Sequence, residues 1–152
     1  MAVTKEDIVA LRERTGAGIM DARRALEEAG SNMDKAVEIL RQRGLGVAEK
    51  KAGREASQGL IEAYVHGGRL GALIELNCET DFVARTDDFR QLAREIAMQA
   101  AANGATDADE LKAQTYNRDT SKTIQQLITE TVAKVGENIV LRRVCRFQLG
   151  SE

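Results

Sequence analysis

The chain has 152 residues, a net charge of −2 and two cysteines, and this length suits one larger domain or two small ones. A near-neutral charge gives no overall attraction to nucleic acid or anionic lipid, and no apolar run approaches the roughly 18 residues that a membrane-spanning helix needs. We therefore expect no direct nucleic-acid binding and no membrane association. The N-terminus lacks the apolar stretch of a signal peptide, and the cysteines are far apart, so we expect a reducing, cytoplasmic location.

Residues 1–45 have the pattern of three short helices. The first begins at a capping box, Thr4-x-x-Asp7, and the glycines of residues 15–18 predict the turn that follows it. The second helix carries an apolar stripe and stops at Gly30, with Ile19, Ala22, Ala25 and Leu26 as the stripe residues. The third is predicted to begin at Ser31-x-x-Asp34 and to end near Gly44. Residues 46–57 are polar and helix-competent without a wide apolar face, which predicts a helical linker.

The period then changes, and residues 58–152 are predicted to form an α+β core. Residues 60–65 and 70–76 are typical of two strands joined by a glycine-containing hairpin loop. Apolar stripes over 89–100 and 124–135 predict two long helices, and a short helix capped by Thr106-x-x-Asp109 is expected between them. A third strand over 139–149 completes an antiparallel three-stranded sheet packed with the two helices.

The last strand presents an apolar face to which we assign a role in self-association. By alternation, one face carries Ile139, Leu141, Cys145, Phe147 and Leu149, interrupted by Arg143. A three-stranded sheet covered on one side leaves edges and a face for another chain. We therefore expect a homodimer, in which Cys145 could lie near its symmetry mate.

The segment "CETDFVART", residues 78–86, places a phenylalanine in a polar, acidic turn between a strand and a helix. Large apolar groups are normally kept out of water, so Phe82 is either folded back into the core or offered to a partner. The motif alone leaves both alternatives open.

Motifs for catalysis or cofactor binding are weak. Gly16-x-Gly18 precedes a helix, but it lacks the preceding strand and the third glycine of a dinucleotide site and the Gly-Lys-Ser/Thr ending of a phosphate loop. The single histidine, His66, could in principle activate Cys78 as a nucleophile, although a polar loop residue and a small buried thiol are the simpler interpretation. We expect no enzymatic activity, no cofactor and no metal site.

Three blocks of the sequence together resemble a known family. These are "LRERTGAGIMDARRALEEAG" (11–30), "LIELNCETDFVAR" (73–85), which contains a Thr-Asp-Phe-Val motif, and "VGENIVLRRVCRF" (135–147). In this order they are similar to bacterial elongation factor Ts, the guanine-nucleotide exchange factor of elongation factor Tu. The resemblance implies a ubiquitin-associated-like helical module that docks on the GTPase and an α+β core that promotes exchange.

The resemblance also implies which residues act. Thr80, Asp81, Phe82 and Val83 are expected to disturb the Mg²⁺ site of elongation factor Tu. Arg12, Ile19 and Met20 are expected to dock on it, although all three could instead belong to a helix face or the core. Longer family members have a doubled core and a coiled-coil excursion, for which this chain has no room, and this favours the homodimer. A non-catalytic adaptor that captures another helix or a ubiquitin-like surface is the alternative function.

Overall fold

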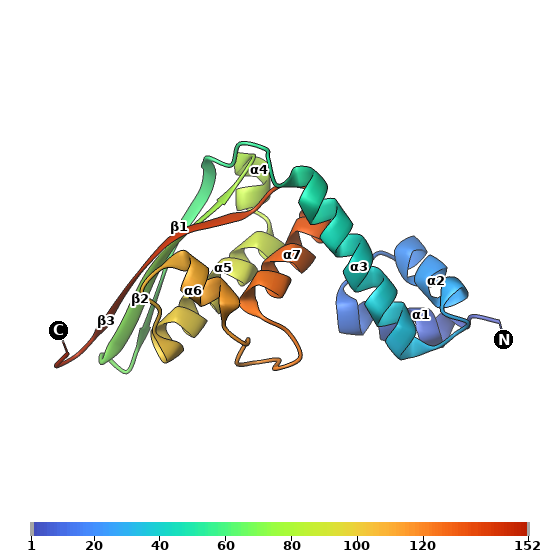
Figure 1. Cartoon of the computed structure of the whole chain (residues 1–152), viewed down its shortest axis with the longest axis horizontal. Helices are drawn as coiled ribbons and strands as arrows, with labels where there is room; N and C mark the ends of the chain where they lie inside the picture. The colour runs from blue at the N-terminus through green and yellow to red at the C-terminus, as the bar shows by residue number, and fades with distance from the viewer. Residues whose placement is uncertain (1, 152) are drawn as a thin grey trace. The chain divides into compact units, whose positions relative to one another are not determined.

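The computed structural model describes residues 2–151, which form two compact units that divide between Glu49 and Lys50. The first unit is helical, and the second combines a sheet with helices (Figure 1). The chain is therefore α+β, with a helical module before a sheet-containing core, as the sequence predicts.

The first unit contains α1 (Lys5–Thr15), α2 (Ile19–Glu28) and most of α3 (Met33–Lys51). The predicted capping box is present: the Asp7 backbone N–H donates to the Thr4 hydroxyl at 3.1 Å, and the Thr4 backbone N–H donates to the Asp7 carboxylate at 3.2 Å. The helices enclose a small core of mostly small side chains, namely Leu11, Ala22, Ala25, Leu26, Ala29 and Ala36. Alanines let short helices approach closely, so even a unit of this size buries a core.

Two details of the third helix differ from the prediction. Asn32, not Ser31, begins it, because the Lys35 backbone N–H donates to the Asn32 side chain at 3.0 Å. The helix also continues through Gly44 to Lys51. A glycine ends a helix when it takes the left-handed conformation, and Gly44 has no positive φ and is buried. The linker predicted over 46–57 is thus helical only to Lys51.

The second unit is built on a sheet of β1 (Gln58–His66), β2 (Leu70–Cys78) and β3 (Val140–Gln148), antiparallel throughout and in the order β1-β2-β3. Gly67 and Gly68 join β1 to β2 with φ of 58° and 69°. Two successive positive φ values define the hairpin turn that matches strand twist, and glycine takes them without strain.

Helices cover one face of this sheet (Figure 1). They are α5 (Asp87–Asn103), α6 (Ala108–Ala113) and α7 (Ile124–Val135), and the single-turn α4 (Asp81–Ala84) lies at one end. The helix ends follow local signals: Gly136 takes the left-handed conformation after α7, and Asp107 rather than Thr106 caps α6. The largest buried side chains between sheet and helices are Ile74, Leu76, Phe89, Ile96, Leu111 and Ile124.

A β-bulge in β3 corrects the predicted face of that strand. Glu75 pairs with Arg143 whereas the next residue, Leu76, pairs with Leu141, so Arg142 is the extra residue. One extra residue reverses the alternation of every side chain beyond it. Ile139 and Leu141 therefore lie in the core, while Cys145 and Phe147 are exposed on the opposite face.

Within residues 2–151 no helix combines the length and the apolar character needed to cross a membrane.

Candidate functional site

The Thr-Asp-Phe-Val motif forms the single-turn helix α4 directly after β2. The Thr80 hydroxyl accepts a hydrogen bond from the Val83 backbone N–H at 3.3 Å and so caps the turn. Successive helical residues point about 100° apart, and this separates the two apolar side chains of the motif. Val83 is buried, whereas 80% of the Phe82 side chain is exposed. Phe82 is therefore not a core residue.

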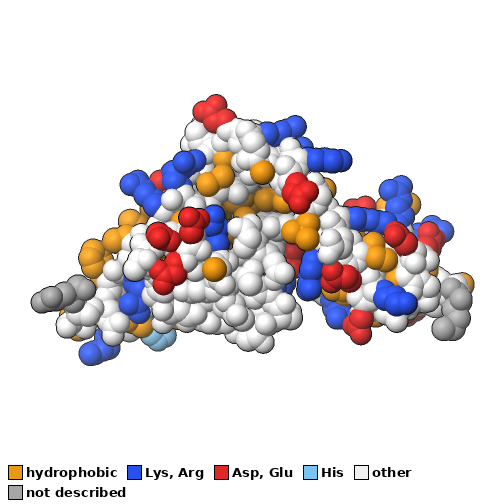
Figure 2. Space-filling model, in the orientation of Figure 1, with side chains coloured by type: hydrophobic (Ala, Val, Ile, Leu, Met, Phe, Trp, Pro, Cys, Tyr) orange, Lys and Arg blue, Asp and Glu red, His pale blue; other side chains and the backbone are white. Residues whose placement is uncertain are grey.

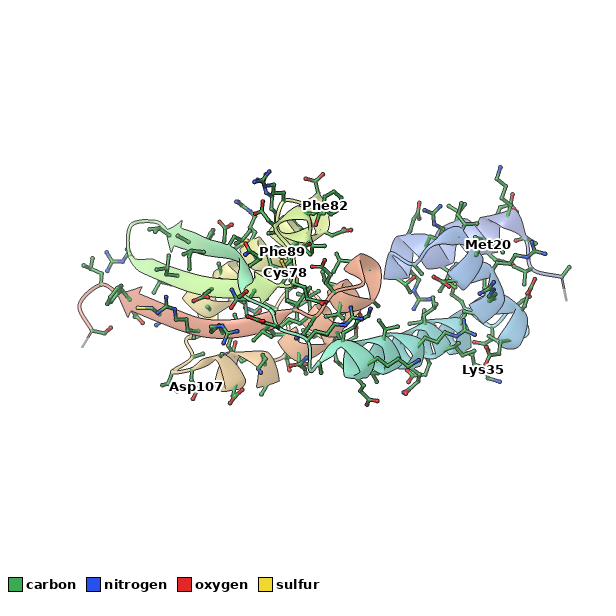
Figure 3. The ribbon with its side chains drawn as sticks, turned by 90° about the horizontal axis from the view of Figure 1, so that it is seen from above. Met20, Lys35, Cys78, Phe82, Phe89 and Asp107 are labelled. Atoms are coloured by element: carbon green, nitrogen blue, oxygen red, sulfur yellow. The ribbon has the colours of Figure 1, made fainter. Side chains whose placement is uncertain are left out.

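Figure 3 shows Phe82 at the outer edge of the second unit, while Phe89 and Cys78 lie inside it. Phe82 is the most exposed of the large hydrophobic side chains in the described part of the chain. Its neighbour Asp81 forms an ion pair with Arg85 at 2.6 Å, one helical turn away. Both partners are exposed, so the pair contributes little to stability, and the Asp81 carboxylate remains accessible on the same surface as Phe82.

Two carboxylates connect this turn to the segment that precedes β3. Glu137 accepts hydrogen bonds from the backbone N–H groups of Glu79 (3.2 Å) and Thr80 (3.0 Å) and from the Thr80 hydroxyl (2.7 Å). In return, Glu79 accepts one from the backbone N–H of Asn138 at 2.7 Å. We call residues 79–80 and 137–138 the acidic clasp. The sequence alone does not reveal these contacts, because no local pattern places residue 137 beside residue 80.

Cys78 lies next to the turn, in surroundings that disfavour the reactive thiolate form. Its thiol is buried and donates to the Thr80 carbonyl at 3.1 Å. Burial, followed by the negative charge of Glu137, raises the pKa of Cys78 from 9.0 to about 11, so the thiol stays protonated near neutral pH. A nucleophilic cysteine needs the opposite shift.

His66 cannot serve Cys78 as a base. Across the β1-β2 hairpin, His66 pairs with Leu70 and Cys78 pairs with Gln58, so the two side chains stand at opposite ends of strand β2. At about 3.3 Å per residue, the eight steps of that strand separate them by roughly 26 Å. His66 contacts Tyr64 instead, with the phenol oxygen 3.1 Å from Nδ1. The thiol-enzyme hypothesis is therefore wrong.

The three predicted docking residues lie together around the turn between α1 and α2. Arg12 donates from Nε to the Ala17 carbonyl at 3.2 Å and so supports the turn. Ile19 and Met20 begin α2 and are 56% and 55% exposed. The sequence placed Ile19 on the buried stripe of α2, but the stripe is buried only from Ala22 onward, because Ile19 is the first residue of the helix and lies beyond the packed core.

The face of the sheet away from the helices is apolar and open. Val65 and Phe147 flank Gly71 in one row of cross-strand partners, and Leu73 lies between Ala63 and Cys145 in the next. Beside these rows, Arg143 pairs with Glu75 at 2.9 Å. We call this surface the open sheet face, and its large exposed members are Ile61, Val65, Leu73 and Phe147. Figure 2 shows hydrophobic side chains along the outer flank of the sheet, at the left of the view.

Among the described residues, 2–151, no three His, Cys, Asp or Glu side chains are grouped so as to hold a metal ion.

Comparison with known proteins adds the family. The sequence model described as Elongation factor TS matches residues 79–152, which include the turn, the acidic clasp and β3. Proteins named Elongation factor Ts match nearly the whole chain. Those of Carboxydothermus hydrogenoformans and Moorella thermoacetica are 43% and 42% identical, over 97% of this chain and 89% and 96% of theirs. That of Thermodesulfovibrio yellowstonii is 40% identical, over 99% of this chain and 98% of the relative.

The fold and the exposed turn define a class of protein in which a helical module precedes an α+β core, and the core exposes an aromatic side chain on a short helical turn. The relatives, which are at least 40% identical over almost the full chain, make the family specific. The chain belongs to the elongation factor Ts family, and its role is that of a translation elongation factor in protein biosynthesis. Each of these alignments spans 194 positions, more than the chain has residues, so the relatives carry additional segments.

Proposed function

We propose that this chain binds elongation factor Tu in its GDP-bound form and promotes release of the nucleotide, so that GTP can reload. The observation that carries the proposal is the exposure of Phe82, whose side chain is four-fifths exposed. The turn that carries it is held in place by the Thr80 cap, by the buried Val83 and by the hydrogen bonds to Glu137. An exposed phenylalanine on such a turn gains free energy if it is buried in a pocket of another protein. Membership of the elongation factor Ts family supports elongation factor Tu as that other protein.

Nucleotide exchange of this kind needs the Mg²⁺ ligands and the phosphate-binding groups to be displaced, and it needs no acid–base or covalent catalysis. A GTPase holds GDP through its phosphates and a Mg²⁺ ion, which requires near-ideal octahedral geometry. A side chain that enters beside the metal and shifts its ligands therefore weakens nucleotide binding without any acid or base. In the proposal Phe82 is this wedge, Asp81 contacts the partner beside it, and Thr80 and Val83 hold the turn.

The exchange factor must bind the nucleotide-free partner more tightly than the loaded one, because equal affinity for both states shifts nothing. Burying one phenylalanine side chain contributes roughly 1.5–3 kcal/mol, which corresponds to about one to two decades in an equilibrium constant. Phe82 thus supplies a substantial part of the difference. The remainder comes from the rest of the contact surface.

The N-terminal unit has a separate task in this proposal. Its exposed Ile19 and Met20 form a small apolar patch beside the turn that Arg12 supports. The unit has its own core and takes no part in the acidic clasp. We assign it to docking, which supplies affinity for both states of the partner, while the core supplies the displacement.

We further propose that the active form is a homodimer that joins through the open sheet face. Ile61, Val65, Leu73 and Phe147 are between 48% and 77% exposed, and a protein that stays monomeric rarely exposes a contiguous apolar patch of this kind. A two-fold axis brings the same patch of each copy together and closes the assembly. The second copy would stand in for the second half of the doubled core expected in longer family members.

The deciding experiment measures GDP release. Elongation factor Tu is loaded with a fluorescent GDP, mixed with excess unlabelled GDP, and followed with and without increasing amounts of this protein. We expect the release rate to rise with concentration and to saturate. If the release rate is unchanged at tens of micromolar of the protein, the exchange function is wrong. The alternative function, a non-catalytic adaptor, is then favoured.

A further inference from the structure

The position of Phe82 depends on residues other than itself, because its side chain makes little contact with its own protein. Helix α4 has only four residues, and a single turn of helix is unstable in isolation. Its orientation must therefore come from the groups that hold its two ends. Val83 and Ala84 are buried and fix the second half of the turn from below.

The entry to the turn is fixed by Glu137. One carboxylate oxygen, Oε1, accepts from the consecutive backbone N–H groups of Glu79 and Thr80, and the other, Oε2, accepts from the Thr80 hydroxyl. Hydrogen bonds to a charged acceptor are stronger than neutral ones, and two acceptor atoms restrain direction as well as distance. The same hydroxyl caps α4, so Glu137 acts on the residue from which the helix starts.

The support for Glu137 is itself well anchored. It follows Gly136, the residue that ends α7, and precedes Asn138, whose backbone N–H donates to Glu79. The side-chain amide of Asn138 donates to the Arg54 carbonyl at 2.9 Å, which ties the segment before β1 to the same point. Residues 79–80 and 137–138 therefore hold each other from two directions.

We infer that Glu137 is a positioning residue for exchange, a role that rests on the proposed function of Phe82 as the wedge. Glu137 orients the turn before the partner is met, so that the aromatic ring enters the partner without first having to be ordered. A misplacement of about 1 Å can reduce the rate of a step that depends on geometry by about a hundred-fold. Loss of Glu137 should therefore reduce the saturated rate of GDP release and leave affinity largely unchanged.

The test compares Glu137→Ala with Glu137→Gln in the fluorescent GDP assay, as a function of the concentration of this protein. We expect Glu137→Ala to lower the saturated rate by roughly ten- to hundred-fold, with a half-saturating concentration within about three-fold of the wild type. Glu137→Gln should keep most of the rate, because the amide oxygen can accept from both N–H groups and the amide nitrogen can donate to the Thr80 hydroxyl oxygen.

A control variant and a double variant separate positioning from general stability. Glu130→Ala removes another partly buried carboxylate of the same unit, which accepts from Lys122 at 2.8 Å and 3.1 Å, and it should leave exchange unchanged. In the Phe82→Ala background, Glu137→Ala should have no further effect, because its contribution passes through Phe82.

An undiminished saturated rate in Glu137→Ala, or losses that multiply in the double variant, would overturn the positioning role. If Phe82→Ala alone retains the full rate, the wedge itself is wrong, and the positioning role falls with it. If Glu137→Ala does not fold, Thr80→Val is compared with Thr80→Ser, because only serine keeps the hydroxyl that donates to Glu137 and that also caps α4. Equal rates for these two variants also overturn the inference.

Discussion

Phe82 and Phe89 are seven residues apart and opposite in burial: Phe82 is 80% exposed, whereas Phe89, in the first turn of α5, is fully buried. The same truncation should therefore have opposite consequences at the two positions. Phe82→Ala is expected to change the free energy of unfolding by less than about 0.5 kcal/mol and to slow saturated GDP release by about ten- to hundred-fold.

Phe89→Ala is the matched control for this prediction. It leaves a cavity in the core and should cost about 3–5 kcal/mol of unfolding free energy. Denaturant unfolding measures stability, and the fluorescent GDP assay measures exchange. A Phe82→Ala protein that is strongly destabilised, or that exchanges at the wild-type rate, would show that the exposed ring is not the wedge.

Phe147 tests the proposed homodimer. It is 77% exposed on the open sheet face, so Phe147→Asp should be harmless to a single chain. In a dimer that joins through this face, however, it would bury two carboxylates without partners. We expect light scattering at tens of micromolar to give a dimer mass for the wild type and a monomer mass for the variant.

Val9→Asp provides the comparison, because Val9 is 45% exposed but belongs to the N-terminal unit. It should leave the dimer intact. If the wild-type protein has a monomer mass at the same concentration, the proposed dimer is wrong. If the Phe147→Asp protein remains dimeric, the dimer interface does not include the open sheet face.

The sequence predicted features whose causes are local. The Thr4–Asp7 capping box and the glycine-containing hairpin loop between the first two strands each depend on a few neighbouring residues, and both are present as expected. The α+β class followed from the change of hydrophobic period near residue 58. The predicted helix end at Gly44 is wrong, because a glycine stops a helix only if its backbone turns left-handed, and Gly44 is buried and helical.

Features that depend on distant partners were out of reach. The bulge at Arg142 arises where β3 meets β2, and that single residue moves Phe147 from the predicted face to the other. The acidic clasp joins residues almost sixty positions apart. Neither leaves a periodic signal. The motif around Phe82 is visible in the sequence, but which of its two apolar side chains faces the core depends on how the turn packs, and the structure buries Val83 and exposes Phe82.

Ile19 and Met20 test the division of labour between the two units. Both are about half exposed at the start of α2. If they dock on both states of the partner, their loss weakens binding uniformly and changes half-saturation rather than the saturated rate. We expect Ile19→Ala combined with Met20→Ala to raise the half-saturating concentration about ten-fold or more at an unchanged maximum, consistent with roughly 1.4 kcal/mol per decade.

Val9→Ala removes an exposed apolar side chain of the same unit outside this patch and should leave both parameters unchanged. A reduced maximum with unchanged half-saturation in the double variant would mean that the N-terminal unit takes part in displacement.

Cys78 makes the stability of the second unit sensitive to alkaline pH. Burial, and next the charge of Glu137, raises its pKa from 9.0 to about 11 in the folded protein. A group whose folded-state pKa is raised contributes stability that is complete below the unfolded pKa and is lost as the pH rises through the folded one. The loss should therefore fall between pH 9 and pH 11, and two pKa units correspond to about 2–3 kcal/mol.

Other groups titrate in the same window, so the measurement must be a difference. Unfolding free energies of Cys145→Ser and of Cys145→Ser combined with Cys78→Ala are compared from pH 7 to pH 11, which also removes the exposed thiol from both proteins. The difference in unfolding free energy between Cys145→Ser and the double variant should be constant up to about pH 9. Above that pH the Cys145→Ser protein should lose stability relative to the double variant, because only its unfolded state gains a Cys78 thiolate in that range. A difference that stays flat to pH 11 would mean that the thiol below the Phe82 turn ionises as readily in the folded protein as in the unfolded chain.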